Sequence, residues 1–342
     1  MKLGKSGVVA ALGTAQTLAW ASSYYLPAML AAPMARDVGV SAPTVFAAFS
    51  AALIVSALLG PYAGRSIDRW GGRPVLMGTN VVFALGLAGL GLAQGPAGLF
   101  AAWLLLGIGM GSGLYEAAFA ALVRLYGQSS RTSITGITLI AGFASTVGWP
   151  LSAFLEVQIG WRGACFTWAA LHLVLGLPLN ALLPRVAVSA DEQPGASHDS
   201  PERDAGSKPL RATLTLSFVF AATWFISTAM AAHLPRLLQA AGASLATAVF
   251  VGALIGPAQV GARLLEFGLL RRLHPLLSAR IAAAPHPLGV LALRVFGAAG
   301  GGGVRCSPRS RQRNPHDCEG HAALGHLRPT GLRPPTGPLD GA

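Results

Sequence analysis

The segment "GRSIDRWGGR", residues 64–73, carries three arginines and one aspartate between two long apolar runs. The flanking runs, residues 43–63 and 75–95, each reach the roughly 20 residues that an α-helix needs to cross a bilayer. A compact charged stretch between two membrane-length runs predicts a turn at the membrane surface. We call residues 64–73 the charged segment.

The composition of the whole chain agrees with a membrane protein. Of its 342 residues, 53% are hydrophobic and only 11% are charged, against about 25% charged in soluble domains. Only helices and closed barrels satisfy their backbone hydrogen bonds in lipid. Apolar runs of this length therefore predict an all-α, polytopic membrane helix bundle. The further runs lie near residues 8–32, 97–122, 133–155, 163–183, 212–233, 245–262 and 281–300.

The distribution of basic residues predicts the partners and the orientation of the chain. The formal net charge is +12, but the basic residues sit in short spacers between apolar runs, which argues against a nucleic-acid partner. With a cytoplasmic N-terminus, only Arg36, Arg162 and Arg236 face outside, as the positive-inside rule favours. We therefore expect a multi-pass protein of the plasma (inner) membrane, with the lipid bilayer as its partner.

An internal echo predicts the domain organisation. "LLGPYAGRSIDR" (58–69) resembles "LIGPAQVGARLLE" (254–266), and internal repeats are a common plan of secondary transporters. A polar, Ser/Pro-rich stretch separates the two copies, which is typical of a water-exposed linker. The predicted parts are an N-terminal six-helix bundle (1–183), a cytoplasmic linker (184–211), a partial C-terminal bundle (212–300) and a disordered tail (301–342).

The charged segment resembles the signature loop between helices two and three of major facilitator superfamily transporters, broadly G-x-x-x-D-R-x-G-x-R. The matching residues are Gly64, Asp68, Arg69, Gly71 and Arg73. The resemblance implies a major facilitator-like fold and secondary active transport of a small organic solute by alternating access. It also implies that these residues form a conformational latch. The plainer alternative is a loop whose charges only fix the topology.

The fourth apolar run departs from the family pattern. "WLLLGIGMGSG" (103–113) has the family's glycine pattern, but Trp103 stands where many proton-coupled members have an arginine. This weakens any prediction of proton coupling. A coupling ion therefore stays an open candidate partner.

Polar and aromatic residues inside apolar runs are the candidates for a substrate path. Gln16, Trp20 and Tyr24 recur every four residues and share one helix face; an aromatic belt at the membrane interface is the alternative, which Tyr25 fits well. Glu116 is an acid within an apolar run, which marks a functional position. A structural pairing with Arg124 or with the charged segment is equally compatible with Glu116.

The sequence offers nothing for an enzyme, a cofactor or a metal. It has no nucleophile beside a base and no phosphate-binding glycine loop ahead of a helix. Cys306, His316, Cys318 and His321 lie at irregular spacing in an Arg/Pro-rich stretch, unlike a zinc site.

The character of the chain changes near residue 300, and prolines and charges interrupt every apolar window beyond it. Codons for "QRNPHDCEGHAALGHLRP", starting at Gln312, permit "SGILTIAKGTLPLGIFG" when they are read displaced by one base. We therefore expect a frameshift near residue 300 and an incomplete second bundle. The alternative function is then a non-transporting, membrane-inserted remnant of a transporter gene.

Overall fold

The computed structural model describes residues 3–185 and 210–268, and the described part is helical throughout, without a β-strand. The helices of the first range are α1 (Lys5–Ser22), α2 (Leu26–Val38), α3 (Ala42–Trp70), α4 (Gly72–Leu92), α5 (Pro96–Gly113), α6 (Tyr115–Tyr126), α7 (Ser130–Ala141), α8 (Ala144–Leu171) and α9 (Leu177–Ala181). The second range holds α10 (Leu210–Ala240), α11 (Leu245–Ala253) and α12 (Ile255–Gly268). The predicted all-α polytopic bundle is confirmed. Most of the predicted linker, the ninth apolar run and the tail lie outside the described residues, so the predicted domain boundaries stay predictions.

Five described helical stretches are long and apolar enough to cross a membrane, and one of them runs for 86 residues, Pro96–Ala181. At 1.5 Å per residue, a straight helix of that length would be about 130 Å long, roughly four times the hydrocarbon core of a bilayer. The chain turns at Gly127 and Gly160, whose φ angles are 53° and 73°. These left-handed conformations favour glycine, and they divide the stretch into segments of bilayer length.

The charged segment is not a loop, contrary to expectation. α3 continues through Trp70, so Gly64, Asp68 and Arg69 are helical. Only Gly71 separates α3 from α4; its φ is 87°, and its N–H donates to the Ile67 carbonyl over 2.8 Å. Because glycine adopts this φ without steric cost, one residue suffices for the turn; Asp68 and Arg69 lie on the last turn of α3, and Arg73 lies on the first turn of α4.

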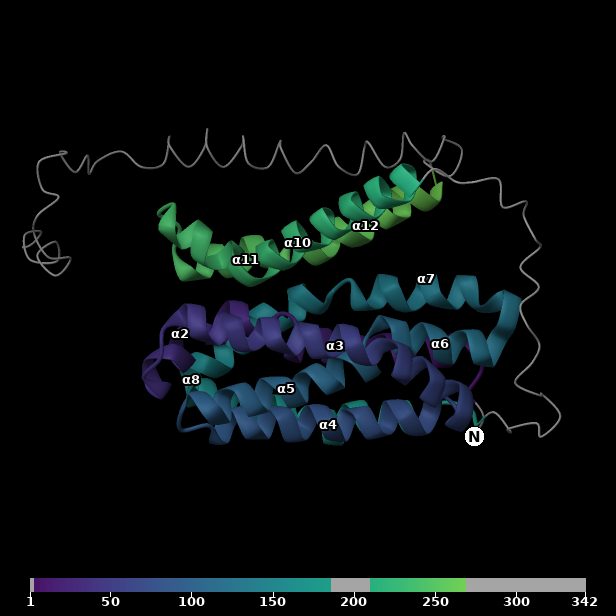
Figure 1. Cartoon of the computed structure of the whole chain (residues 1–342), viewed down its shortest axis with the longest axis horizontal. Helices are drawn as coiled ribbons and strands as arrows, with labels where there is room; N and C mark the ends of the chain where they lie inside the picture. The colour runs from purple at the N-terminus through teal and green to yellow at the C-terminus, as the bar shows by residue number, and fades with distance from the viewer. Residues whose placement is uncertain (1–2, 186–209, 269–342) are drawn as a thin grey trace, which may run out of the picture. The chain divides into compact units, whose positions relative to one another are not determined.

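α3 and α5 form an extensive contact in which their backbones approach closely. Figure 1 shows these helices and α4 running side by side. A methyl group on Gly107 would lie 2.5 Å from the Ala52 carbonyl oxygen, and one on Gly111 would lie 2.7 Å from the Ser56 carbonyl oxygen. Small residues allow two membrane helices to approach to backbone contact. The "GIGMG" pattern therefore fixes the position of α5 against α3.

A buried polar chain joins α1, α4 and the π-helical turn His172–Gly176. The two ring nitrogens of His172 contact Ser22 Oγ at 2.8 Å and Asn80 Oδ1 at 2.9 Å, and Phe83 stacks on the ring. The Asn80 amide group donates to the Leu76 carbonyl over 2.8 Å. Each member of this chain has a partner, as burial in an apolar bundle requires.

At the opposite end of α4 from the charged segment, an ion pair and its hydrogen bonds connect α2, α4 and α8. Arg162 and Asp37 form the ion pair at 2.8 Å, and Arg162 also donates to the Gly91 carbonyl over 2.7 Å. Trp161 Nε1 donates to the same Asp37 carboxylate over 3.1 Å. The Arg162 charge, an exception to the positive-inside pattern, therefore has a local carboxylate partner.

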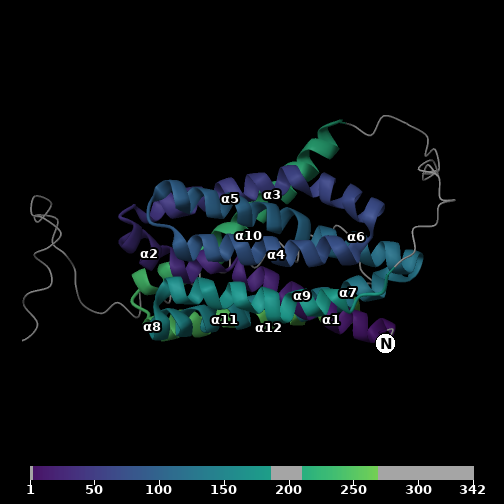
Figure 2. The ribbon, with the colours of Figure 1, turned by 90° about the horizontal axis from the view of Figure 1, so that it is seen from below.

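α11 and α12 pack against α8 (Figure 2). The approach is close because Gly252 lies under Trp149, and a side chain on Gly252 would overlap the indole ring. Many large apolar side chains of α10 are exposed, among them Phe218 at 73% and Phe225 at 75%. Such a surface is suited to lipid or to further helices, since water would not solvate it favourably.

The Gly107 contact gives a stability prediction. Replacing Gly107 with Ala should destabilise the bundle, because the methyl group meets main-chain atoms of Ala52 that cannot rotate away. Overpacking of this kind costs about 1–3 kcal/mol. We expect a lower midpoint of thermal unfolding in detergent for Gly107→Ala.

The matched control is Gly60→Ala on α3, where the new methyl group has no neighbour within 4 Å. It should keep or raise the midpoint, because alanine is about 1 kcal/mol better than glycine inside a helix. Equal midpoints for the two variants would contradict the close α3–α5 contact.

Candidate functional site

Four of the predicted apolar runs contain a break between two helices within the described residues. The interruptions are Ser23–Tyr25 between α1 and α2, Leu114 between α5 and α6, residues 142–143 between α7 and α8, and Leu254 between α11 and α12. The first predicted span, 8–32, is therefore two helices and not one. Residues next to all four interruptions line a cavity of about 260 Å³, namely Tyr24, Tyr25, Tyr115, Ala141 and Ile255.

At each interruption, a side chain of another helix donates a hydrogen bond to a main-chain carbonyl. The bonds are Trp149 Nε1 to Tyr25 O (3.1 Å), Gln16 Nε2 to Gly113 O (2.7 Å), Arg263 Nη1 to Thr138 O (2.9 Å) and Thr146 Oγ1 to Ala253 O (2.6 Å). Irregular backbone at membrane depth is tolerated only where protein or a cavity surrounds it. These bonds tie each interruption to its neighbours.

The cavity wall is aromatic on most sides. Its rings are Trp20, Tyr24, Tyr25, Tyr115 and Trp224. The Trp20 ring lies 5.0 Å from Tyr24 and 4.8 Å from Tyr115, centroid to centroid. Ser227, Gln259 and Arg263 are the other polar wall residues. An apolar, aromatic cavity with a few polar groups is typical of a small-molecule site.

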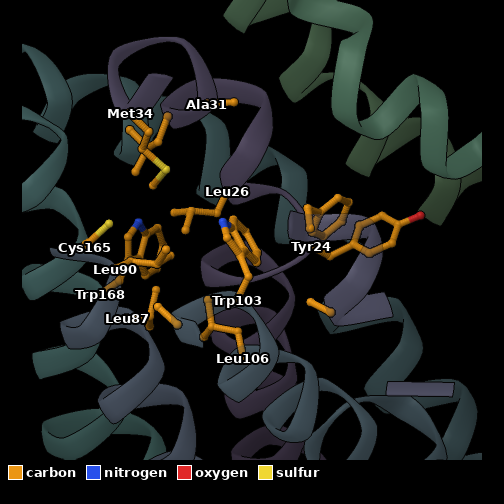
Figure 3. Close-up of a cluster of buried hydrophobic side chains, with 14 of the residues drawn as sticks. Tyr24, Leu26, Ala31, Met34, Leu87, Leu90, Trp103, Leu106, Cys165 and Trp168 are labelled. Carbon is orange, nitrogen blue, oxygen red and sulfur yellow. The ribbon is translucent and has the colours of Figure 1, made fainter. Parts of the chain in front are cut away.

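Tyr24 links the cavity to α10. Its hydroxyl donates to Thr228 Oγ1 over 2.7 Å. Figure 3 shows the Tyr24 ring at the edge of a buried cluster with Leu26 and Trp103, and its hydroxyl pointing out of that cluster. Trp103 itself is fully buried, with its ring 5.3 Å from Phe49. Trp103 therefore belongs to the core and not to the cavity wall.

The predicted substrate-path residues divide into two pairs. Trp20 and Tyr24 line the cavity, as does Tyr25. Gln16 is 2% exposed, and its amide group donates a hydrogen bond to the Gly113 carbonyl. Gln16 therefore stabilises the interruption at Leu114. Glu116 is exposed on the first turn of α6 and is not a cavity-lining residue. Its place on a solute path stays a prediction.

Arg263 is the wall residue that the sequence reasoning missed. It follows directly after the apolar run 245–262 and lies on α12, half-buried, where it lines the cavity. Tyr115 lines the same cavity. One signal could have found Arg263: Gln259 and Arg263 are four residues apart, so both lie on one face of a helix.

The charge on the cavity wall is positive in the described part of the chain. Arg263 is charged, and no carboxylate occurs among the wall residues of the described part. The Trp20 indole N–H is buried and has no hydrogen-bond partner. The same part of the chain has no group of three or more His, Cys, Asp or Glu residues placed to bind a metal. The cavity wall therefore carries a positive charge without a carboxylate to neutralise it, beside neutral groups that can donate hydrogen bonds.

The charged segment docks onto α6. The Arg124 guanidinium donates to the main-chain carbonyl of Asp68, and Gly72 lies directly against Ala121. The Asp68 side chain is exposed, and among the side chains that the structure describes the only ion pair is Arg162–Asp37. The predicted pairing of Glu116 with Arg124 is thus not seen, and Arg124 contacts the charged segment instead. Arg73 lies away from the α6 contact, beside a second hollow with Trp70 and Arg185.

Several known proteins are similar to this chain. A 38 kDa uncharacterized protein encoded in the 23S RNA operon of Thermoproteus tenax is 29% identical over 78% of this chain and 66% of its own length. Monocarboxylate transporter 11 of Mus musculus is 34% identical over 41% of this chain and 31% of its own. The 3-(3-hydroxy-phenyl)propionate transporter of Escherichia coli is 28% identical over 50% of this chain and 41% of its own.

The match therefore covers less than half of each named transporter. Among solved structures, tetrameric PepTSo2 aligns with a TM-score of 0.42 and 16% identity, over 82% of this chain and 58% of that one. The family profile of the Major Facilitator Superfamily matches residues 12–304. With its multi-pass helical fold and this match over most of its length, the chain belongs to the Major Facilitator Superfamily.

Proposed function

We propose that this chain is a secondary transporter that moves a small organic solute across the plasma (inner) membrane by alternating access. The observation that carries the proposal is the convergence of four helix interruptions on one cavity. Transporter substrate sites are typically built from discontinuous helices near the middle of the membrane. The solute occupies this cavity, and the N-terminus is cytoplasmic.

The contacts between α1–α9 and α10–α12 suit a movable boundary. Three hydrogen bonds cross it near the cavity: Tyr24 to Thr228, Thr146 to Ala253, and Arg263 to Thr138. Individual hydrogen bonds contribute only about 0.5–1.5 kcal/mol net. A few such bonds hold one arrangement and still allow another, which alternating access requires.

The charged segment acts as the conformational latch in this proposal. It joins α3 to α4 through Gly71 alone and contacts α6 through the Asp68 carbonyl. A movement of α6 is therefore passed directly to the α3–α4 turn. The exposed Asp68 carboxylate is available for a partner that changes between conformations.

Filling the cavity should stop transport. Ser227→Trp places a large ring in a cavity of about 260 Å³. Because the new ring occupies the volume that the solute needs, uptake should fall to the background of empty liposomes. The measurement is counterflow uptake of a panel of labelled organic solutes into proteoliposomes that contain the purified 342-residue chain.

The matched control is Thr223→Trp, one turn earlier on α10 and outside the cavity wall. It should transport like the wild type. If the wild type moves no solute in the panel while it inserts normally, the alternative of a non-transporting membrane remnant is favoured. Equal uptake by Ser227→Trp and Thr223→Trp would place the solute elsewhere.

Asp68→Asn separates the latch from a purely topological role. The variant keeps the main-chain carbonyl that Arg124 contacts and removes only the exposed carboxylate charge. We therefore expect normal membrane abundance with an altered turnover rate, measured by immunoblot and uptake in parallel. Arg124→Ala, which removes the contact itself, should lower stability as well. Loss of insertion in Asp68→Asn, or unchanged turnover, would assign these charges to topology alone.

A further inference from the structure

The cavity wall presents hydrogen-bond donors that lack an acceptor. The Trp20 indole N–H is buried without a partner. Arg263 uses one N–H on the Thr138 carbonyl and lines the cavity. A guanidinium carries five N–H donors in a planar fork, so several remain for a ligand. An unpaired buried donor costs about 1–3 kcal/mol, which an acceptor on a bound solute would recover.

These donors lie on one continuous wall. Trp20 and Tyr115 are in ring contact at 4.8 Å, and both line the cavity together with Arg263. Gln259 lies one turn before Arg263 on α12 and also lines the cavity. No acidic residue joins them within the described part of the chain. A solute here meets a cation and neutral donors, which together favour an anion with planar oxygen acceptors.

The remaining wall residues indicate the shape and polarity of the rest of the solute. Tyr24, Tyr25 and Trp224 add aromatic surface, and Ile226, Met230 and Ile255 add aliphatic surface. The volume of about 260 Å³ lies just below the range of about 300–1,000 Å³ that is typical of small-molecule sites. Aromatic rings stack on flat apolar groups at centroid distances of about 4.5–7 Å. The cavity thus suits a small, flat and otherwise apolar body.

We propose that this cavity binds a small organic carboxylate with a flat apolar body, and that Arg263 and the Trp20 indole N–H hold its carboxylate. The inference rests on the proposed function, because it takes the cavity to be the solute site of a transporter. Binding to the cavity can nevertheless be measured without transport. Arg263 is a substrate-binding residue in this proposal, and its bond to the Thr138 carbonyl fixes its position.

A competing possibility is that the chain neutralises its own arginine. Glu266 follows Arg263 by three residues on α12, a spacing at which helical side chains can pair. Under this alternative Arg263 is structural, and a neutral solute fills the cavity. The two possibilities differ in whether the charge of a ligand matters.

The test compares radiolabelled benzoate with benzamide, which has the same ring but no charge, by equilibrium binding to the purified full chain in lipid nanodiscs. Charge-assisted hydrogen bonds contribute about 1.5–3 kcal/mol. Benzoate should therefore bind the wild type at least about tenfold more tightly than benzamide. Arg263→Gln should abolish this preference, and Arg263→Lys should retain part of it. Trp20→Phe, which keeps a ring and removes the donor, should weaken benzoate binding and leave benzamide binding unchanged.

Arg131→Gln is the matched control, since Arg131 is exposed on the first turn of α7 and away from the cavity wall. It should bind benzoate like the wild type. If Arg263→Gln does not fold, the preference of the wild type and its loss in Trp20→Phe still decide the question. Equal binding of benzoate and benzamide, no benzoate binding, or an unchanged preference in Arg263→Gln overturns the proposal.

The outcome also separates this inference from the proposed function. If benzoate binding depends on Arg263 but the chain transports no solute, the carboxylate site is supported and the proposed transport function is rejected. If the chain transports neutral solutes and Arg263→Gln does not change that transport, the proposed transport function is supported and the carboxylate site is rejected.

Discussion

The structure depends on one constraint: in a bilayer, a helix can be interrupted only where other protein groups satisfy its backbone. This chain interrupts four of its apolar segments, and at each point a side chain from a different helix donates to a main-chain carbonyl. The donors come from α1, α8 and α12. Because each bond needs its partner helix nearby, the interruptions gather around a shared cavity and are not scattered through the bundle.

The same bonds explain why polar residues of one helix face have different roles. Gln16 and Trp20 are one turn apart on α1, but Gln16 supports the Gly113 carbonyl and Trp20 faces the cavity with its N–H unpaired. Arg263 combines both roles, since it holds the Thr138 carbonyl and keeps further donors for a ligand. The contacts between α3 and α5 are made by glycines and involve no charge. The polar interactions described above occur instead at the cavity.

Apolar run length and the charged segment were sufficient to predict the helical membrane fold and the family. They did not predict the interruptions, because residues that can break a helix also occur inside helices that continue: Pro27 follows the break at Ser23–Tyr25, but α3 continues past Pro61 and α8 past Pro150. The spacing grouped Trp20 with Tyr24, and both line the cavity although Tyr24 lies in the interruption after α1; their place on a solute path stays a prediction. Glu116 lies within an apolar run and Arg263 directly after one, and only packing shows that Arg263 lines the cavity while Glu116 is exposed.

The most direct test of the account is whether the cavity at the interruptions contains water in the membrane. In a chain with Cys165, Cys306 and Cys318 replaced by alanine, single cysteines at Ser227 and Thr223 can be reacted with a small charged methanethiosulfonate reagent. Ser227 lines the cavity, and Thr223, one turn away on α10, does not. The account predicts rapid modification at position 227 and slow modification at 223, because the reagent requires a thiolate in water. Equal rates, or faster reaction at 223, would contradict it.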